Sequence, residues 1–226
     1  ATTEIYTLSL HDALPIYLHD FDPEQDGMSF SEMPGVDRYI LGKLHTLCEE
    51  VDAAYAAFQF PRFYAFIKRF VSADLSNFYL DIAKDRLYIQ STDSFSRRAC
   101  QTVLNELALG LVSCIAPVLP HLAEDVWEHL PYNRHHKSIF QSGWLGAKSE
   151  WTAHQTPEQS AAWNNVLRLR EVVTKAMETA RESKFIRSSL EAKLWLYVSD
   201  VAVFEEAFSQ NTVDELEYTF IVSQAA

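Results

Sequence analysis

Two histidines and an aspartate recur at four-residue intervals in the middle of the chain. His121, Asp125 and His129 stand at positions i, i+4 and i+8, so a helix would place all three along one face. Imidazole and carboxylate groups are ordinary zinc ligands. However, the two histidines would lie about 12 Å apart at about 1.5 Å per residue, which is too far for one ion. A zinc site would need an adjacent pair and further ligands, so we expect surface polar groups and no metal site.

Signatures of a catalytic centre are missing from the sequence. We find no Ser-His-Asp pattern, P-loop, H-E-x-x-H or G-x-G-x-x-G segment, and glycine is scarce, at 6 of 226 residues. The three cysteines, Cys48, Cys100 and Cys114, form no C-x-x-C pair. Their odd number argues against a disulfide framework or a cysteine zinc site and suits a reducing compartment. We therefore predict no catalytic residue and no cofactor in this chain.

Clustered cations are the clearest sign of a binding site in this sequence, because guanidinium and ammonium groups bind phosphate oxygens. Asp93 or Ser94 can cap a helix here. If Ser94 is the cap, Arg97 and Arg98 occupy its first turn, where cations oppose the helix dipole. A residue placed against its local preference often serves a partner. We predict six residues on a surface that binds phosphates: Lys84, Arg86, Arg97, Arg98, Arg181 and Lys184.

A structural role is the alternative for these residues. The polar side chains that interrupt the aromatic segment 74–88 can form a partly buried network that fixes the register of a helical bundle. Asp81 and Lys84 can pair at i, i+3, and Arg97 or Arg98 can pair with Asp93 or Asp81.

The charge distribution leaves both interpretations open. The chain has 19 basic and 31 acidic residues and a formal net charge of −12. The excess acid lies mainly in residues 1–60 and 194–226, whereas residues 61–100 and 161–193 are each net +3. Whole-chain acidity argues against indiscriminate nucleic-acid binding but permits a local basic surface. Solvated helix faces would produce the same pattern.

The elements that would position these residues are mostly helices. Apolar residues at steps of three and four predict helices over about 36–58, 61–86, 94–115, 120–130 and 158–183, with a long ordered loop before the last. The alternation from Leu190 to Val198 predicts a strand, followed by a short helix near 201–209 and a second strand over 217–222. We therefore expect a mainly α protein, with a helical bundle over 17–186 and the start of a small, truncated α/β unit over 187–226.

The first sixteen residues are treated separately. They lack the basic start and the apolar run of a signal peptide, and they show no clear periodicity. From Glu4 to Ile16 the string resembles the translation of a sequencing adapter, although a genuine variable N-terminus is the alternative. No apolar run in the chain approaches the roughly 20 residues that a membrane span needs.

Residues 74–88, DLSNFYLDIAKDRLY, resemble the anticodon-binding helical domain of the isoleucyl-tRNA synthetases. Shorter segments agree: DRYIL at 37–41, RRACQTVL at 97–104, APVLPHLAEDVW at 116–127, LREVV at 169–173, SSLEAK at 188–193 and FIVSQ at 220–224. The resemblance covers residues 18–224 and looks closest to cyanobacterial or plastid-type enzymes. One departure is Arg187, where the family pattern has glycine.

The resemblance implies a bundle that docks the anticodon stem-loop of isoleucine tRNA within a class I synthetase. Such enzymes activate isoleucine with ATP and transfer it to tRNA. The His-Ile-Gly-His and Lys-Met-Ser-Lys-Ser motifs of that chemistry are absent from this chain, as is the cysteine zinc module of many bacterial members. We therefore expect a fragment that binds but does not catalyse, while ATP, Mg²⁺ and any zinc belong to other parts of the enzyme.

The expected partners are isoleucine tRNA and the rest of the synthetase chain, with no membrane. The expected location is the cytoplasm, or alternatively the plastid stroma. Two other interpretations stay open on the sequence. One is a helical protein-interaction module whose basic regions are solvated faces, and the other is the anticodon domain of a sibling synthetase, such as the valyl enzyme.

Overall fold

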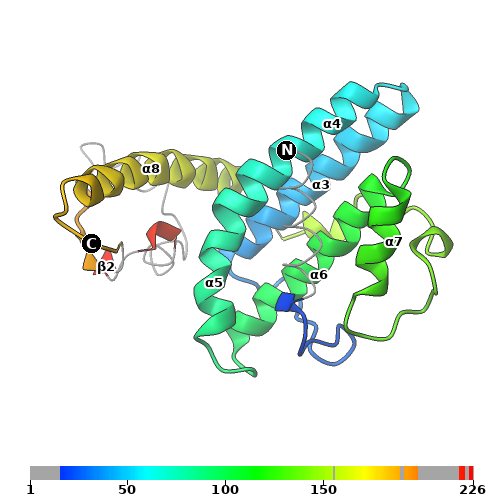
Figure 1. The fold of residues 1–226 in the computed structure, drawn as a ribbon, viewed down its shortest axis with the longest axis horizontal. Coiled ribbons are helices and arrows are strands. Elements are labelled where there is room, and N and C mark those ends of the chain that lie inside the picture. Colours follow the sequence, from blue (N-terminus) through cyan, green and yellow to red (C-terminus); the bar gives the residue numbers. More distant parts are fainter. Residues whose placement is uncertain (1–15, 155, 189–190, 198–218, 222–223, 226) are drawn as a thin grey trace. The chain divides into compact units, whose positions relative to one another are not determined.

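The computed structural model of the chain describes residues 16–154, 156–188, 191–197, 219–221 and 224–225. It divides into two compact units, Ala1–His154 and Gln155–Ala226, and their described parts are mainly α-helical, which agrees with the expected fold class (Figure 1). The predicted leader, except for Ile16, and the predicted helix near 201–209 lie outside the described residues. Among the described helices, none is long and apolar enough to cross a membrane.

The core of the first unit lies between α3 (Gly35–Ala56) and α6 (Phe95–Ile115). Both helices bury a continuous apolar stripe, as their three- and four-residue spacing predicted. Gly110 of α6 lies directly against Leu44 of α3, because a Cβ atom on Gly110 would stand 3.1 Å from both Leu44 methyl groups. The glycine therefore allows the two helices to approach closely.

The predicted helix over 61–86 is present but not uniform. It consists of α4 (Phe60–Arg69), a π-helical segment η1 (Phe70–Tyr79) and α5 (Leu80–Tyr88), which continue one another along the chain. A π-helical stretch of ten residues is unusual. It buries Phe70, Val71, Leu75, Phe78 and Tyr79 together, residues that would also share one face of an ordinary α-helix.

The two ends of α6 agree with the sequence signals. The Ser94 hydroxyl accepts a hydrogen bond from the backbone N–H of Arg97 at 3.3 Å, so Ser94 and not Asp93 is the cap. Beyond α6, the short helix α7 (Pro120–Glu128) begins at its proline. The following loop contains two 3₁₀ turns, η2 (Ile139–Gln141) and η3 (Ser149–Trp151), and buried Ile139 and Trp151 hold these turns in place.

The second unit begins with α8 (Pro157–Glu182), which starts at a reciprocal capping box between Thr156 and Gln159. The sequence interpretation placed this helix in the bundle, whereas the compact units divide before it, at 154/155. The side chain of Arg170 donates to the carbonyl of Thr219, which joins α8 to the C-terminal segment.

Strand structure is confined to one short parallel pair among the described residues, β1 (Lys193–Leu194) and β2 (Gln224–Ala225). The predicted alternation is present: Ala192, Leu194 and Leu196 are half-buried, and the residues between them are exposed. The second predicted strand is wrong where it is described, because Thr219 and Phe220 form a buried helical turn and pairing falls on 224–225 instead. Positive φ angles occur at Phe58, Lys184 and Ile221 but not at Arg187, so its turn needs no glycine.

Candidate nucleic-acid interface

Arg86 lies inside the first unit and not on its surface. Its side chain is 5% exposed, and its two terminal nitrogens donate to the two carboxylate oxygens of Asp37 at 2.7 and 2.6 Å. Its remaining donors bind Ser96, with Nε reaching the hydroxyl at 2.9 Å and Nη2 the carbonyl at 2.8 Å. Burial lowers the pKa of Arg86, but the Asp37 carboxylate outweighs this effect and holds that pKa well above its ordinary value. Arg86 therefore ties α5 to the beginnings of α3 and α6.

The same buried network includes a tyrosine and a thiol. The hydroxyl of Tyr79 donates to Asp37 at 2.7 Å and lies 3.7 Å from the sulfur of Cys100. Burial, together with the negative charge of Asp37, raises the pKa of Tyr79 well above its ordinary value. Burial also raises the pKa of Cys100 to about 11. Both groups are therefore protonated at neutral pH, and the network carries one positive and one negative charge.

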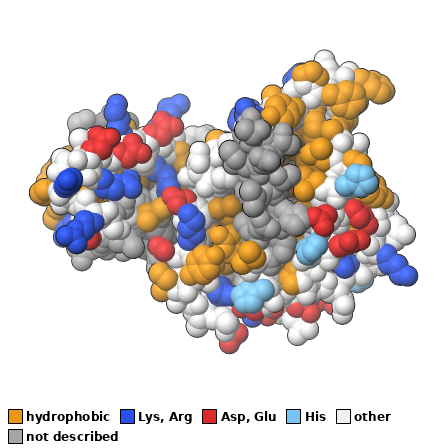
Figure 2. Space-filling view, in the orientation of Figure 1, with side chains coloured by type: hydrophobic (Ala, Val, Ile, Leu, Met, Phe, Trp, Pro, Cys, Tyr) orange, Lys and Arg blue, Asp and Glu red, His pale blue; other side chains and the backbone are white. Residues whose placement is uncertain are grey.

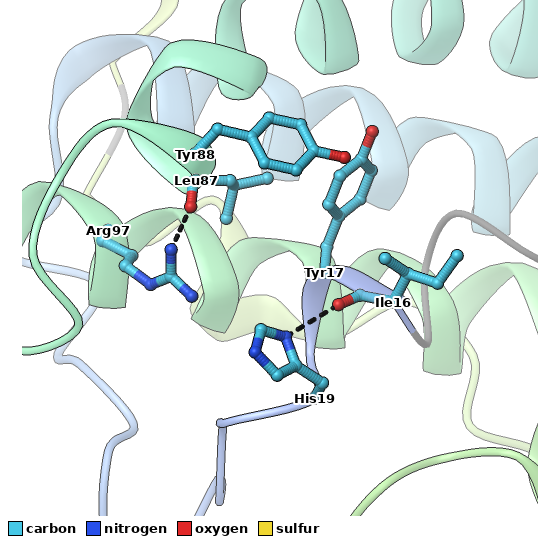
Figure 3. Close-up of a pocket in the computed structure, with 6 residues that line it drawn as sticks. All are labelled: Ile16, Tyr17, His19, Leu87, Tyr88 and Arg97. Carbon is cyan, nitrogen blue, oxygen red and sulfur yellow. Dashed lines mark hydrogen bonds between the residues drawn. The ribbon is translucent and has the colours of Figure 1, made fainter.

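Arg97 is likewise turned inward, as Figure 3 shows. One terminal nitrogen donates to the carbonyl of Leu87 and the other to the carboxylate of Asp20 at 2.9 Å. Burial raises the pKa of Asp20, but hydrogen bonds from Gln101 and Arg97 outweigh it, so the pKa lies below its ordinary value. Arg97 forms part of the wall of a hollow of about 560 Å³ (Figure 3), lined also by Ile16, Tyr17, His19, Leu87 and Tyr88.

Arg98 fastens the segment before α3 to α6. It donates to the carbonyl of Asp20 at 2.8 Å and lies 3.4 Å from the carboxylate of Asp26 and 3.7 Å from that of Asp93. Its side chain is 14% exposed. The pairing with Asp93 is the structural alternative that the sequence had left open.

These contacts give three of the six predicted cations partners inside the first unit. Arg86, Arg97 and Arg98 donate to carboxylates and carbonyls inside the first unit and so hold the bundle together, although the buried Nε atom of Arg97 has no hydrogen-bond partner. Asp37 and Asp20, the partners of Arg86 and Arg97, lie 49 and 77 positions away in the sequence, which is why spacing alone did not reveal these two pairs.

The other three cations are exposed. Lys84 lies on α5, and its ammonium stands 3.3 Å from the carboxylate of Asp81, as the i, i+3 spacing predicted. In the second unit, Arg181 lies in the last turn of α8, and Lys184 follows it with a φ of 59°. They remain predicted phosphate contacts.

The sequence interpretation overlooked an exposed aromatic and basic face on α4. Phe60, Tyr64 and Lys68 lie on its outer side, and among all residues of α4 only Phe63 is fully buried. The signal was present as a four-residue spacing within FPRFYAFIKR. The spacing was overlooked because the neighbouring aromatic residues have the spacing of buried residues on a helix.

The His121, Asp125 and His129 group shows local bonding. The Nδ1 atom of His129 lies 2.7 Å from the carbonyl oxygen of Asp125 and 3.4 Å from its carboxylate. Within the described ranges, no three His, Cys, Asp or Glu side chains gather closely enough to hold a metal ion.

Comparison with known proteins identifies the helical arrangement. The anticodon-binding domain of tRNA ligases matches residues 37–196 of this chain. The match begins in α3 and ends two residues after β1. The chain belongs to this family.

The anticodon-binding domain has close relatives among cyanobacterial proteins named isoleucine–tRNA ligase. The chain is 49% identical to the isoleucine–tRNA ligase of Thermosynechococcus vestitus over 215 residues, which covers 92% of this chain and 22% of the relative. The chain is 46% identical to the isoleucine–tRNA ligase of a Synechococcus strain, again over 92% of this chain and 22% of the relative. It is 49% identical to the isoleucine–tRNA ligase of Gloeobacter violaceus over 92% of this chain and 20% of the relative. The chain thus spans about a fifth of the length of these relatives.

Proposed function

We propose that this chain is the part of an isoleucine–tRNA ligase that holds the anticodon stem-loop of isoleucine tRNA. The observation that carries the proposal is the 49% identity, over 92% of the chain, to proteins named isoleucine–tRNA ligase. The match to the anticodon-binding domain falls on the helical bundle and α8, which supports a role in binding the tRNA.

The remaining activity belongs to regions that this chain does not include. Activation of isoleucine with ATP and Mg²⁺, and its transfer to tRNA, would take place elsewhere in the ligase, and a zinc module would also lie elsewhere. The partners proposed for this chain are isoleucine tRNA and the rest of the ligase, in the cytoplasm. Lys84, Arg181 and Lys184 are the proposed phosphate contacts, because each is exposed.

Binding of tRNA transcripts to the 226-residue chain tests the proposal. The chain should bind an isoleucine tRNA transcript more tightly than the same transcript with an altered anticodon. The logarithm of the affinity should fall linearly with the logarithm of the salt concentration, because phosphate contacts release counterions. Equal affinity for both transcripts, or no binding at low salt, would overturn the proposal.

A further inference from the structure

The outer face of α4 carries aromatic and cationic side chains in helical rows. Phe60, Tyr64 and Lys68 stand at i, i+4 and i+8, so their side chains follow one another along one side of the helix. Phe60 is 49% exposed and Tyr64 is 56% exposed, although aromatic residues usually bury most of their surface. The row therefore presents two partly exposed aromatic rings followed by an exposed lysine to solvent.

A second row beside it holds two arginines against a ring. The guanidinium carbons of Arg62 and Arg69 lie 5.4 and 5.6 Å from the centre of the Phe66 ring, within the range of cation–π attraction. Arg62 also donates to Gln59 at 2.7 Å, and Arg69 donates to Glu50 at 2.7 Å. These contacts keep both guanidinium groups close to the aromatic row.

The end of the α3–α4 hairpin supports the rows with further rings. Tyr55 stacks on Phe63 with ring centres 4.9 Å apart, and it forms T-shaped pairs with Phe60 and Trp144, with ring centres 6.1 and 6.0 Å apart. Its hydroxyl donates to the carbonyl of Cys114 at 2.8 Å, which anchors the group to α6. At the turn itself, Phe58 is 80% exposed and has a φ of 54°, a conformation that bulky residues rarely adopt.

The charge around these rows is positive. Residues 53–73 contain three cations, Arg62, Lys68 and Arg69, and no aspartate or glutamate. Asp52 and Asp74 flank this stretch in the sequence, and on α3 Glu49 lies 3.5 Å from His45 while Glu50 binds Arg69. Figure 2 shows hydrophobic side chains gathered at this end of the first unit, with Lys and Arg side chains at their edge.

Exposed rings combined with cations suit a single-stranded nucleic acid. Every base has a flat face that stacks on an aromatic ring, and each phosphate is attracted to a neighbouring cation. We infer that Phe60 and Tyr64 stack on unpaired bases of an RNA loop while Lys68 contacts its backbone. This inference rests on the proposed function and assigns contact with the RNA loop to α4. We call Phe60, Tyr64 and Lys68 the stacking face.

Two RNA probes and one ring deletion test the inference. The probes are an RNA hairpin with the anticodon stem and loop of isoleucine tRNA, and a blunt duplex of the same stem without the loop. Replacing Tyr64 with alanine should weaken hairpin binding by about 5- to 150-fold, the range for loss of one stacked base, and leave duplex binding unchanged. Tyr64→Phe should bind the hairpin as the parent chain does, because the ring is retained.

Controls separate stacking from folding. Tyr64 is exposed, so its replacement should leave the denaturation midpoint unchanged. Phe95→Ala is the matched control, because Phe95 is 50% exposed and lies at the start of α6, at the other end of the bundle from the α3–α4 turn (Figure 1). A second variant, Lys68→Gln, should reduce the slope of log affinity against log salt by about 0.7, the value for one single-strand phosphate contact.

The outcomes distinguish this inference from the proposed function. If the parent chain and Tyr64→Ala bind the hairpin equally well, Tyr64 does not stack on a base. The inference is then refuted and the proposed function stands. If Tyr64→Ala weakens hairpin and duplex alike, base stacking is also refuted. If the parent chain binds neither probe at low salt, both the inference and the proposed function fail.

Discussion

Replacing Arg86 with methionine should strongly destabilise the first unit. The chain that remains folded should bind RNA with unchanged affinity. The change removes both donors to the Asp37 carboxylate, at 2.7 and 2.6 Å, while Asp37 stays 0% exposed. The hydroxyl of Tyr79 still donates to that carboxylate, but it carries no positive charge. Removing one partner of a buried ion pair costs about 3–5 kcal/mol. This is a large part of the roughly 5–15 kcal/mol that stabilises a typical domain.

Urea denaturation measures this loss. Trp127 and Trp151 are 6% and 2% exposed in the first unit, so their fluorescence should change when that unit unfolds. Lys84→Met is the matched control, because Lys84 lies on the same helix with a 55% exposed side chain, and its loss should change stability by less than about 0.5 kcal/mol. The double variant Asp37→Leu with Arg86→Met should recover much of the stability, since neither buried charge remains.

The opposite pattern would refute the structural role of Arg86. In that case Arg86→Met and Lys84→Met would have the same urea midpoint, and Arg86→Met would bind the tRNA transcript more weakly. Arg86 would then reach phosphate, as the sequence interpretation had it, and the bidentate contact with Asp37 would not represent the folded chain in solution.

Two further predictions concern pH and helix capping. The pKa of Asp20 is lowered in the folded chain, so its contribution to stability is present above about pH 4, its unfolded value, and is lost as the pH falls through the folded pKa. In urea titrations, Asp20→Asn should therefore lower the free energy of unfolding by about 1–2 kcal/mol at pH 7 and by progressively less below about pH 4. A loss that does not change with pH would refute this explanation. Thr156→Ala removes the capping hydroxyl of α8 and should cost about 1 kcal/mol in thermal melting followed by circular dichroism. Thr174→Ala, in the exposed middle of the same helix, should not destabilise it, and equal losses in both variants would mean that capping is not the cause.

Several helix starts in both units follow from short-range signals in the sequence. Ser94, Pro120 and the Thr156–Gln159 pair each lie within a few residues of the helix that they begin, so the helix starts were readable directly. The π-helical segment was not readable, because its apolar residues also fit an ordinary helical face and only packing decides the wider turn. The candidate site divides in the same way. Lys84 and Asp81 pair within one turn of helix, as expected, whereas the exposed face of α4 emerges only once Phe63 is seen to be its buried side.

The sequence by itself determined the helical class, most helix boundaries and, through the segment 74–88, the resemblance to the anticodon-binding domain. Tertiary structure alone decided which cations face solvent. Arg86 meets Asp37 across 49 positions in the chain, and Arg97 meets Asp20 across 77. A basic residue has the same local preferences whether its partner is a phosphate or a distant carboxylate. Only folding brings the two charges together, and the cost of burying either one alone then keeps them paired.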